Sequence, residues 1–218
     1  RSLQQKLSTI KIDGGLYTVG YSGDQFCYDI ELPEHNVYLN DYKIDAYPVT
    51  NRQYIEFMDD GGYSDFQYWL SDGWEKVQNE QWKSPMYWES IDGKWMTRDF
   101  LGRRKINLNE PVCHVSFYEA DAYCKWAGKR LPTEAEWEKA ACWNEKKQRK
   151  SIFPWGDEPP DHTRANLLES YLWNCTEIGA YPEGKSHYGC HQMIGDVWEW
   201  TSSEFSGYPG FKTGFSEY

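Results

Sequence analysis

The chain has 218 residues, of which 34 are acidic and 23 basic, so its formal net charge is −11. A chain of this length buries roughly 70% of its unfolded surface, which is enough for one large domain or two small ones. The acidic excess argues against binding to phosphate backbones or anionic lipids, and we expect neither nucleic acid nor a membrane as a partner. The stretch that begins at Arg1 lacks the apolar run of a secretory signal, which favours a cytoplasmic protein.

Aromatic side chains are unusually abundant, with 12 Trp, 17 Tyr and 9 Phe, whereas aliphatic residues are sparse. Large rings bury much area each and carry polar groups, so they can form the core of a fold that is rich in loops. The six cysteines form no C-x-x-C pair and no zinc-like spacing. For a cytoplasmic chain we therefore expect reduced thiols.

The first half of the chain begins with strand signals. Residues 10–20 alternate around a Gly-Gly pair, which predicts a hairpin, and a second strand-like stretch follows at 36–47. Thr50 and Gln53 have the spacing of a capping box, which predicts a helix near 50–60. The tryptophan-rich segment 65–100 has poor periodicity and is expected to be a long excursion packed through its rings.

The second half shows the clearest local structure. A strand-like stretch at 111–115 precedes two further capping boxes, which predict helices at 116–128 and 133–144. The basic residues at 146–150 indicate a solvated loop, and turns with short strands follow, including one at 197–201. No internal repeat or linker divides the chain, so we expect one α+β domain over residues 1–218.

Five strings of residues resemble the formylglycine-generating-enzyme, or sulfatase-modifying-factor, superfamily. They occur in the family's order across much of the chain. The strings are YPVTN at 47–51, PVCHVS at 111–116, GKRLPTEAEWE at 128–138, FPWG at 153–156 and GDVWEW at 195–200. The resemblance implies a mixed fold with little regular secondary structure, distantly related to C-type lectins.

Further strings are most similar to the C-terminal domain of ergothioneine-pathway sulfoxide synthases of the EgtB type. They are GGY at 61–63, SPMYW at 84–88, GAYP at 179–182, YPGF at 208–211 and FSEY at 215–218. Such enzymes use non-heme iron(II) and O2 to join cysteine or γ-glutamylcysteine to hercynine (trimethylhistidine), with oxidation of the sulfur to a sulfoxide. In that family an N-terminal DinB-like domain holds the iron through three histidines, and substrates bind between the two domains. We therefore expect a chain that lacks the DinB-like domain, is incomplete at its C-terminus and is inactive alone.

The five histidines are the candidate ligands for iron. They are His35, His114, His162, His187 and His191. Only His187 and His191 have a helix-compatible spacing, and the residues between them form a poor helix, while His114 lies between apolar residues as a core histidine does. Because non-heme iron needs two or three such ligands with open positions, we expect the Fe(II) to be bound mainly outside this chain.

The resemblance also assigns substrate-binding positions near the end of the chain. Family members carry two tyrosines three residues apart after the YPGF string, the first catalytic and the second lining the hercynine pocket. These positions are Phe215 and Tyr218 here, so Tyr218 matches and Phe215 departs from the pattern. Both are substrate-binding candidates, no catalytic residue is assigned, and the alternative for Tyr218 is a ring packed at the domain edge.

Calcium is the second metal that the resemblance suggests. The superfamily binds it through an Asn-aliphatic pair and a downstream Asp-x-aromatic motif, which correspond to Asn166-Leu167 and Gly179-x-Tyr181. Gly179 replaces the carboxylate, so Ca2+ would depend more on backbone carbonyls and water. A structural turn without calcium is the alternative, and the stretch 195–199 is a further candidate site.

Three other functions are open at this point. An ovothiol-type synthase would use histidine itself in place of hercynine. A formylglycine-generating oxidase would bind copper(I) through two thiolates after the GDVWEW string, but no cysteine follows Cys190 in this chain. A non-catalytic, lectin-like binding module is the third alternative.

Overall fold

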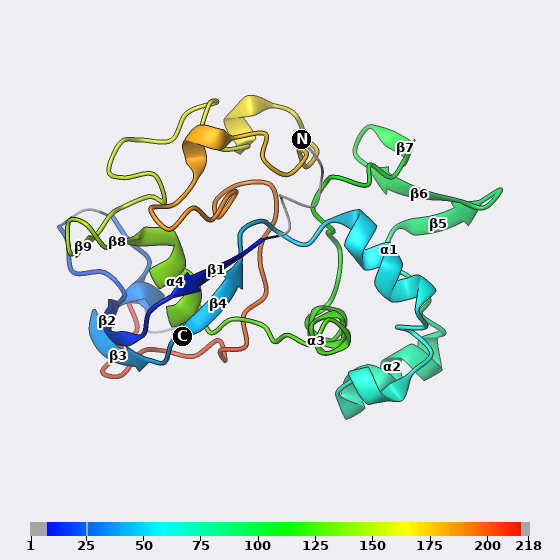
Figure 1. The fold of residues 1–218 in the computed structure, drawn as a ribbon, viewed down its shortest axis with the longest axis horizontal. Helices are drawn as coiled ribbons and strands as arrows, with labels where there is room; N and C mark the ends of the chain where they lie inside the picture. The colour runs from blue at the N-terminus through cyan, green and yellow to red at the C-terminus, as the bar shows by residue number, and fades with distance from the viewer. Residues whose placement is uncertain (1–7, 25, 215–218) are drawn as a thin grey trace.

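A computed structural model describes residues 8–24 and 26–214 of the chain. Helices and short strands alternate with long loops, as Figure 1 shows, and the expected α+β class is confirmed. The α-helices are α1 (Asn51–Asp59), α2 (Ser71–Glu80), α3 (Phe117–Trp126) and α4 (Glu134–Cys142). The strands are β1 (Thr9–Ile12), β2 (Gly15–Val19), β3 (His35–Leu39), β4 (Tyr42–Asp45), β5 (Trp88–Ile91), β6 (Lys94–Asp99), β7 (Gly102–Lys105), β8 (Trp143–Asn144) and β9 (Arg149–Lys150). Single 3-10 turns are η2 (Asp29–Glu31), η3 (Phe66–Tyr68), η4 (Leu168–Ser170) and η5 (Pro182–Gly184).

The strands pair in small antiparallel sheets. β1 pairs with β4, β2 with β3 and β8 with β9, while β5, β6 and β7 form a three-stranded meander. The predicted hairpin at 10–20 is wrong, because its two strands pair with β4 and β3 instead of with each other. The Gly14 amide donates to Asp41 Oδ1 at 2.8 Å, so the Gly-Gly pair packs against the turn between β3 and β4.

Three predicted helices are confirmed, together with the capping boxes that predicted them. Thr50, Ser116 and Thr133 each accept a hydrogen bond from the backbone amide three residues later, at the start of α1, α3 and α4. This arrangement is local in sequence, since the cap residue satisfies an amide that has no partner within the helix. Helix α2 was missed because its N-cap, Leu70, makes no side-chain hydrogen bond.

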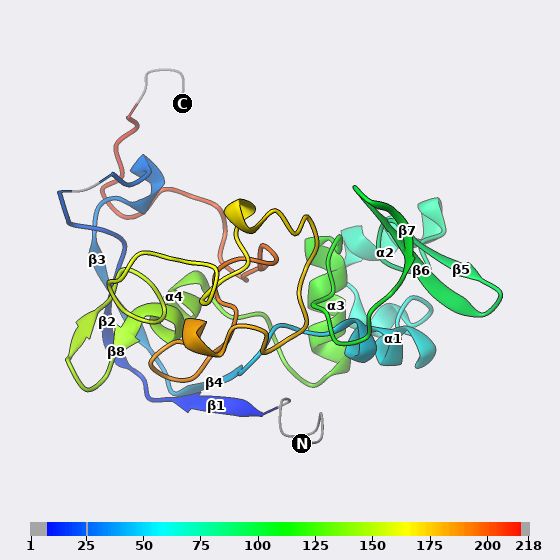
Figure 2. The same ribbon diagram turned by 90° about the horizontal axis from the view of Figure 1, so that it is seen from above.

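Buried residues form two hydrophobic clusters. One, built on Ile12, Tyr17 and Tyr42, lies between β1–β4 and α4, and the other, built on Tyr54 and Phe57, lies among α1, α2 and α3. Figures 1 and 2 show these two groups of elements at opposite ends of the molecule, with the long loops of the second half between them. The aromatic core expected from the composition is present in both clusters.

Two segments predicted as strands form none. At 111–115 the backbone makes one isolated bridge, from Pro111 to Thr50, before His114 takes a φ of 62° that ends the extended path. At 197–201 the chain is irregular, with Trp198 fully exposed and Trp200 half-exposed instead of packed on a sheet. Both segments line a cavity.

Candidate functional site

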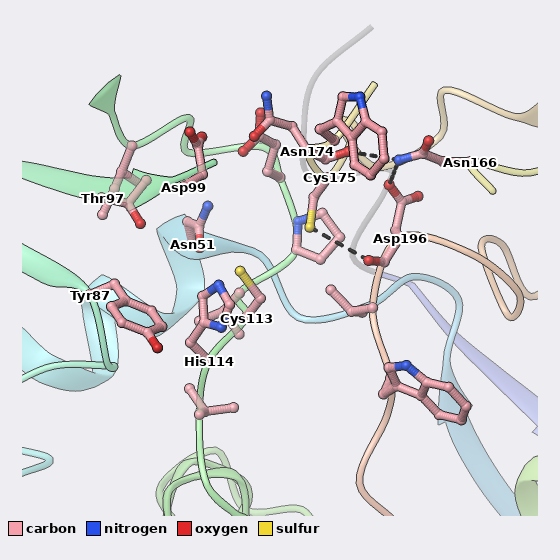
Figure 3. A pocket seen from close by; sticks show the side chains of 18 of the residues that line it. Asn51, Tyr87, Thr97, Asp99, Cys113, His114, Asn166, Asn174, Cys175 and Asp196 are labelled. Atoms are coloured by element: carbon pink, nitrogen blue, oxygen red, sulfur yellow. Dashed lines mark hydrogen bonds between the residues drawn. The ribbon is translucent and has the colours of Figure 1, made fainter. Parts of the chain in front are cut away.

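An open cavity of about 1010 Å³ lies between the β5–β7 meander and the long loops of the second half of the chain. Its walls come from the β5–β7 meander, the segment 110–115, the loop 166–175 and the segment 196–200. The first two segments follow each other in the sequence, the other two lie far from them, and Figure 3 shows side chains of all four converging on one space.

Aromatic rings form much of the cavity wall. Tyr87 and His114 pack edge to face with ring centroids 5.0 Å apart, and Trp200 Nε1 donates to the Val115 carbonyl at 3.0 Å. Trp198 has no shielding, with a relative exposure of 102%. Exposed rings that surround one cavity are typical of a surface that is covered by a ligand or by another part of a protein.

Arg104 pairs with two carboxylates beside these rings. Arg104 donates from Nε to Asp99 Oδ2 at 2.7 Å and from Nη2 to Glu110 Oε2 at 2.8 Å. Desolvation opposes the charge on Asp99, but the hydrogen bonds from Arg104 and from the Leu101 and Gly102 amides together outweigh it and hold the pKa of this carboxyl below its ordinary value. Asp99 therefore remains an anion on the cavity wall at neutral pH.

A hydrogen-bonded network fixes the opposite wall. Asp196 Oδ1 accepts from Asn166 Nδ2 at 2.8 Å and from the Thr176 amide at 2.7 Å, and its Oδ2 accepts from Gln192 Nε2 at 2.7 Å. The preceding Gly195 has a φ of 84°, and a Cβ there would lie 2.5 Å from the Asn166 carbonyl oxygen. Glycine is thus required where the two loops touch.

Two cysteines also face the cavity, from different walls. Cys113 lies on the segment before α3 and Cys175 lies on the loop after η4, and Figure 3 shows their sulfur atoms beside each other in the cavity. Cys175 Sγ additionally lies 3.8 Å from the Asp196 carbonyl oxygen, to which it donates.

The structure brings only some of the calcium candidates together. Asn166 and Leu167 line the cavity, whereas Gly179 lies outside its wall. The Gly179 amide donates to Gln192 Oε1 at 2.6 Å, which connects it to the network around Asp196. Tyr181 is buried beside this network. The calcium site stays a prediction, and so does the substrate-binding role of Phe215 and Tyr218, which lie outside the described residues.

The histidines lie apart from one another. His187 Nε2 accepts from Asn144 Nδ2 at 3.0 Å, His191 stacks on Tyr47 with centroids 4.5 Å apart, and His114 is exposed on the cavity wall instead of buried in the core. Within residues 8–24 and 26–214, no three His, Cys, Asp or Glu side chains are grouped so that they could hold a metal ion. The described residues therefore do not fit the iron(II) implied by the resemblance.

The chain is similar to proteins of known families. The sequence model of the sulfatase-modifying factor enzyme 1-like domain matches residues 1–216. The chain belongs to this family. The resemblance to the EgtB type is shown as well, because the hercynine oxygenases of Mycobacterium tuberculosis and Mycolicibacterium smegmatis are 45% and 42% identical over 84% and 94% of the chain. The chain spans 42% and 47% of those proteins, which is less than half of their length.

More distant relatives share the domain and the fold. The formylglycine-generating enzyme of Mus musculus is 32% identical over 88% of the chain and 57% of that protein. PvdO from Pseudomonas aeruginosa superposes with a TM-score of 0.56 over 89% of this chain and 69% of that one, at 19% identity, which shows the fold alone. In the part of the chain that the structure describes, every helix is too short or too polar to cross a membrane.

Sequence reasoning missed several residues of the cavity. Tyr87 belongs to a string that was recognised only as a family signature, and Arg104 lies in a segment without periodicity. Cys113 and Cys175 were treated as ordinary reduced thiols. The PVCHVS string, in which a cysteine precedes the exposed His114, was the one available signal for this wall.

Proposed function

We propose that this chain forms the substrate-binding part of a hercynine oxygenase, an O2-dependent sulfoxide synthase that joins cysteine or γ-glutamylcysteine to hercynine. The observation that carries the proposal is the difference in identity among its relatives. Hercynine oxygenases are 42–45% identical to the chain, whereas the formylglycine-generating enzymes of Mus musculus and Bos taurus are 32% identical.

The cavity has the chemistry that a trimethylammonium group requires. Its rings include Tyr87, Trp173 and Trp198, and a desolvated cation over the face of a tryptophan or tyrosine is stabilised by about 0.5 to 2 kcal/mol. Four carboxylates and two guanidinium groups line the cavity, so its charge is negative overall. A quaternary ammonium cation is favoured by both features.

The other end of hercynine is a carboxylate, which needs a cationic partner. Arg98 and Arg104 line the cavity, and a guanidinium binds a planar carboxylate through two parallel hydrogen bonds. Arg104 already donates to Asp99 and Glu110. We assign the hercynine carboxylate to Arg98.

The remaining length of the relatives supports a second domain over the cavity. Phe100 and Leu101 on the β6–β7 turn are 92% and 72% exposed, and Trp198 on the facing wall is exposed as well. We assign to the rest of the protein a DinB-like domain that packs on these rings and holds the iron(II), the cofactor that would supply the oxygen chemistry. Phe215 and Tyr218 keep their proposed role in binding the substrate, with Tyr218 beside hercynine.

The test uses the intact protein, purified with Fe(II) and supplied with hercynine, O2 and either cysteine or γ-glutamylcysteine. Mass spectrometry of the products should detect a sulfoxide joined to the imidazole ring with one of the two thiols. Histidine in place of hercynine tests the ovothiol-type reaction, and a cysteine peptide from a sulfatase tests formylglycine formation. Turnover of histidine or of the peptide, without turnover of hercynine, would reject the proposal.

A further inference from the structure

Two thiols meet across the cavity, although their positions in the sequence are distant. Cys113 belongs to the segment that leads from β7 into α3, and Cys175 belongs to the loop that follows η4. Figure 3 shows the two sulfur atoms near the middle of the cavity, one carried by each wall. The two thiols are neighbours, and each shifts the pKa of the other.

The two thiols have different surroundings. The neighbouring Cys175 thiol and the positive charge of Arg104 lower the pKa of Cys113 below its ordinary value despite the burial of this thiol. The neighbouring Cys113 thiol and burial raise the pKa of Cys175. Cys113 is therefore the thiol that ionises first.

The other cysteines lack this arrangement. Burial raises the pKa of Cys124 to about 11 and of Cys142 to about 12, and both pack against hydrophobic clusters away from the cavity. Cys190 is fully buried in the first cluster, and burial raises its pKa to about 11. Thiols in apolar surroundings react slowly, because the thiolate is the nucleophile.

We propose that Cys113 and Cys175 form a reversible disulfide in the cavity wall, made by exchange with a low-molecular-weight disulfide. The thiolate of Cys113 attacks one sulfur of the small disulfide, which gives a mixed disulfide on Cys113 and releases one small thiolate. Cys175 then loses its proton to solvent and attacks the sulfur of Cys113, releasing the second small thiolate. The two protein thiols are oxidised, and one small disulfide is reduced to two small thiols.

The bond would connect two walls of the cavity that belong to distant parts of the chain. It would tie the segment 111–115 to the loop 173–176 and remove both thiols from the cavity. A ligand that needs the space between these walls would bind differently to the two forms. The site is thus a modification site whose state depends on the ratio of small disulfide to small thiol.

The experiment treats the intact, reduced protein with oxidised glutathione and maps its peptides under non-reducing conditions. We expect the loss of two thiols per chain and one linked pair of peptides containing Cys113 and Cys175, reversed by dithiothreitol. Cys175→Ser should accumulate glutathione on Cys113, because the second attack is lost. Cys113→Ser should leave Cys175 unmodified over the same time, and Cys27→Ser is the control that should behave as the wild type.

Circular dichroism and thermal unfolding establish that each variant is folded, and Cys113→Ala and Cys175→Ala repeat the test with a second substitution. The proposal is overturned if the folded wild-type protein yields no Cys113–Cys175 peptide. It is also overturned if glutathione accumulates on Cys175 of Cys113→Ser as fast as on Cys113 of Cys175→Ser, because the exchange then does not begin at Cys113.

Discussion

The side-chain amide of Asn166 donates to the carboxylate of Asp196 at 2.8 Å, across a separation of thirty residues. This bond joins the loop 166–175 to the GDVWEW string, so the two segments form one wall of the cavity. Asp196 has a φ of 56°, in the left-handed region that aspartate tolerates better than most residues. Its position is therefore set by the backbone as well as by its hydrogen bonds.

Removal of this carboxylate should cost much stability. Asp196→Ala leaves donors on Asn166, Thr176 and Gln192 without their acceptor, and we expect a loss of about 2 to 4 kcal/mol in the free energy of unfolding. Asp13→Ala is the control, because Asp13 pairs with Lys11 at an exposed site and its loss should change stability by less than about 0.5 kcal/mol. Urea unfolding measures both, and equal values would contradict the role assigned to Asp196.

The neighbouring glycine offers a matched comparison. Gly195 and Gly61 both have a φ of 84°, but an added Cβ meets the Asn166 backbone only at Gly195 and has open space at Gly61. Gly61→Ala should therefore cost about 1 to 2 kcal/mol, the cost of a left-handed alanine. Gly195→Ala should cost more, since the backbone must also move. If thermal or urea unfolding shows the same loss for both, the close approach of the two loops is not as described.

The sequence predicted those parts of the fold that depend on local chemistry. The three capping boxes act within four residues, and all three helices begin where the boxes place them. The pairing of β1 with β4 depends on residues that are far apart, and alternation around Gly14-Gly15 could not distinguish it from a hairpin. The cavity was beyond sequence reasoning for the same reason, because Arg104, Cys113 and Cys175 meet only after the chain has folded.

Two of the capping boxes should respond to pH in opposite ways. Glu119 is buried, and desolvation raises its pKa above the ordinary value. Glu119 holds its proton more tightly in the folded protein than in the unfolded chain. The folded protein therefore loses stability as pH rises above about 4.3 through the raised pKa. The hydrogen bond from Arg130 lowers the pKa of Glu136, so its stabilisation is lost as pH falls below about 4.3 through the lowered pKa.

Glutamine variants separate these two effects. We expect the wild type to lose stability relative to Glu119→Gln between pH 4 and 7, by about 1.4 kcal/mol for each unit by which the folded pKa is raised. Relative to Glu136→Gln, the wild type should lose stability as pH falls below about 4. Chemical unfolding at several pH values provides the measurement. A difference of the same sign for both variants would show that the two carboxyl groups do not have opposite environments.

The ring of Trp198 provides the most direct test of the substrate assignment. It is fully exposed in this chain and lines the cavity, so a cation bound against it would cover an apolar face that otherwise contacts water. Loss of a desolvated cation–π contact costs about 1 to 2 kcal/mol, which corresponds to about 5-fold to 30-fold weaker binding. In the intact protein, Trp198→Ala should therefore raise the KM for hercynine by this factor and leave the KM for the thiol nearly unchanged.

Phe205→Ala is the control, because Phe205 is 91% exposed but lies outside the cavity wall. Equal kinetic effects of the two variants would mean that exposed rings matter here for domain packing and not for binding the trimethylammonium group.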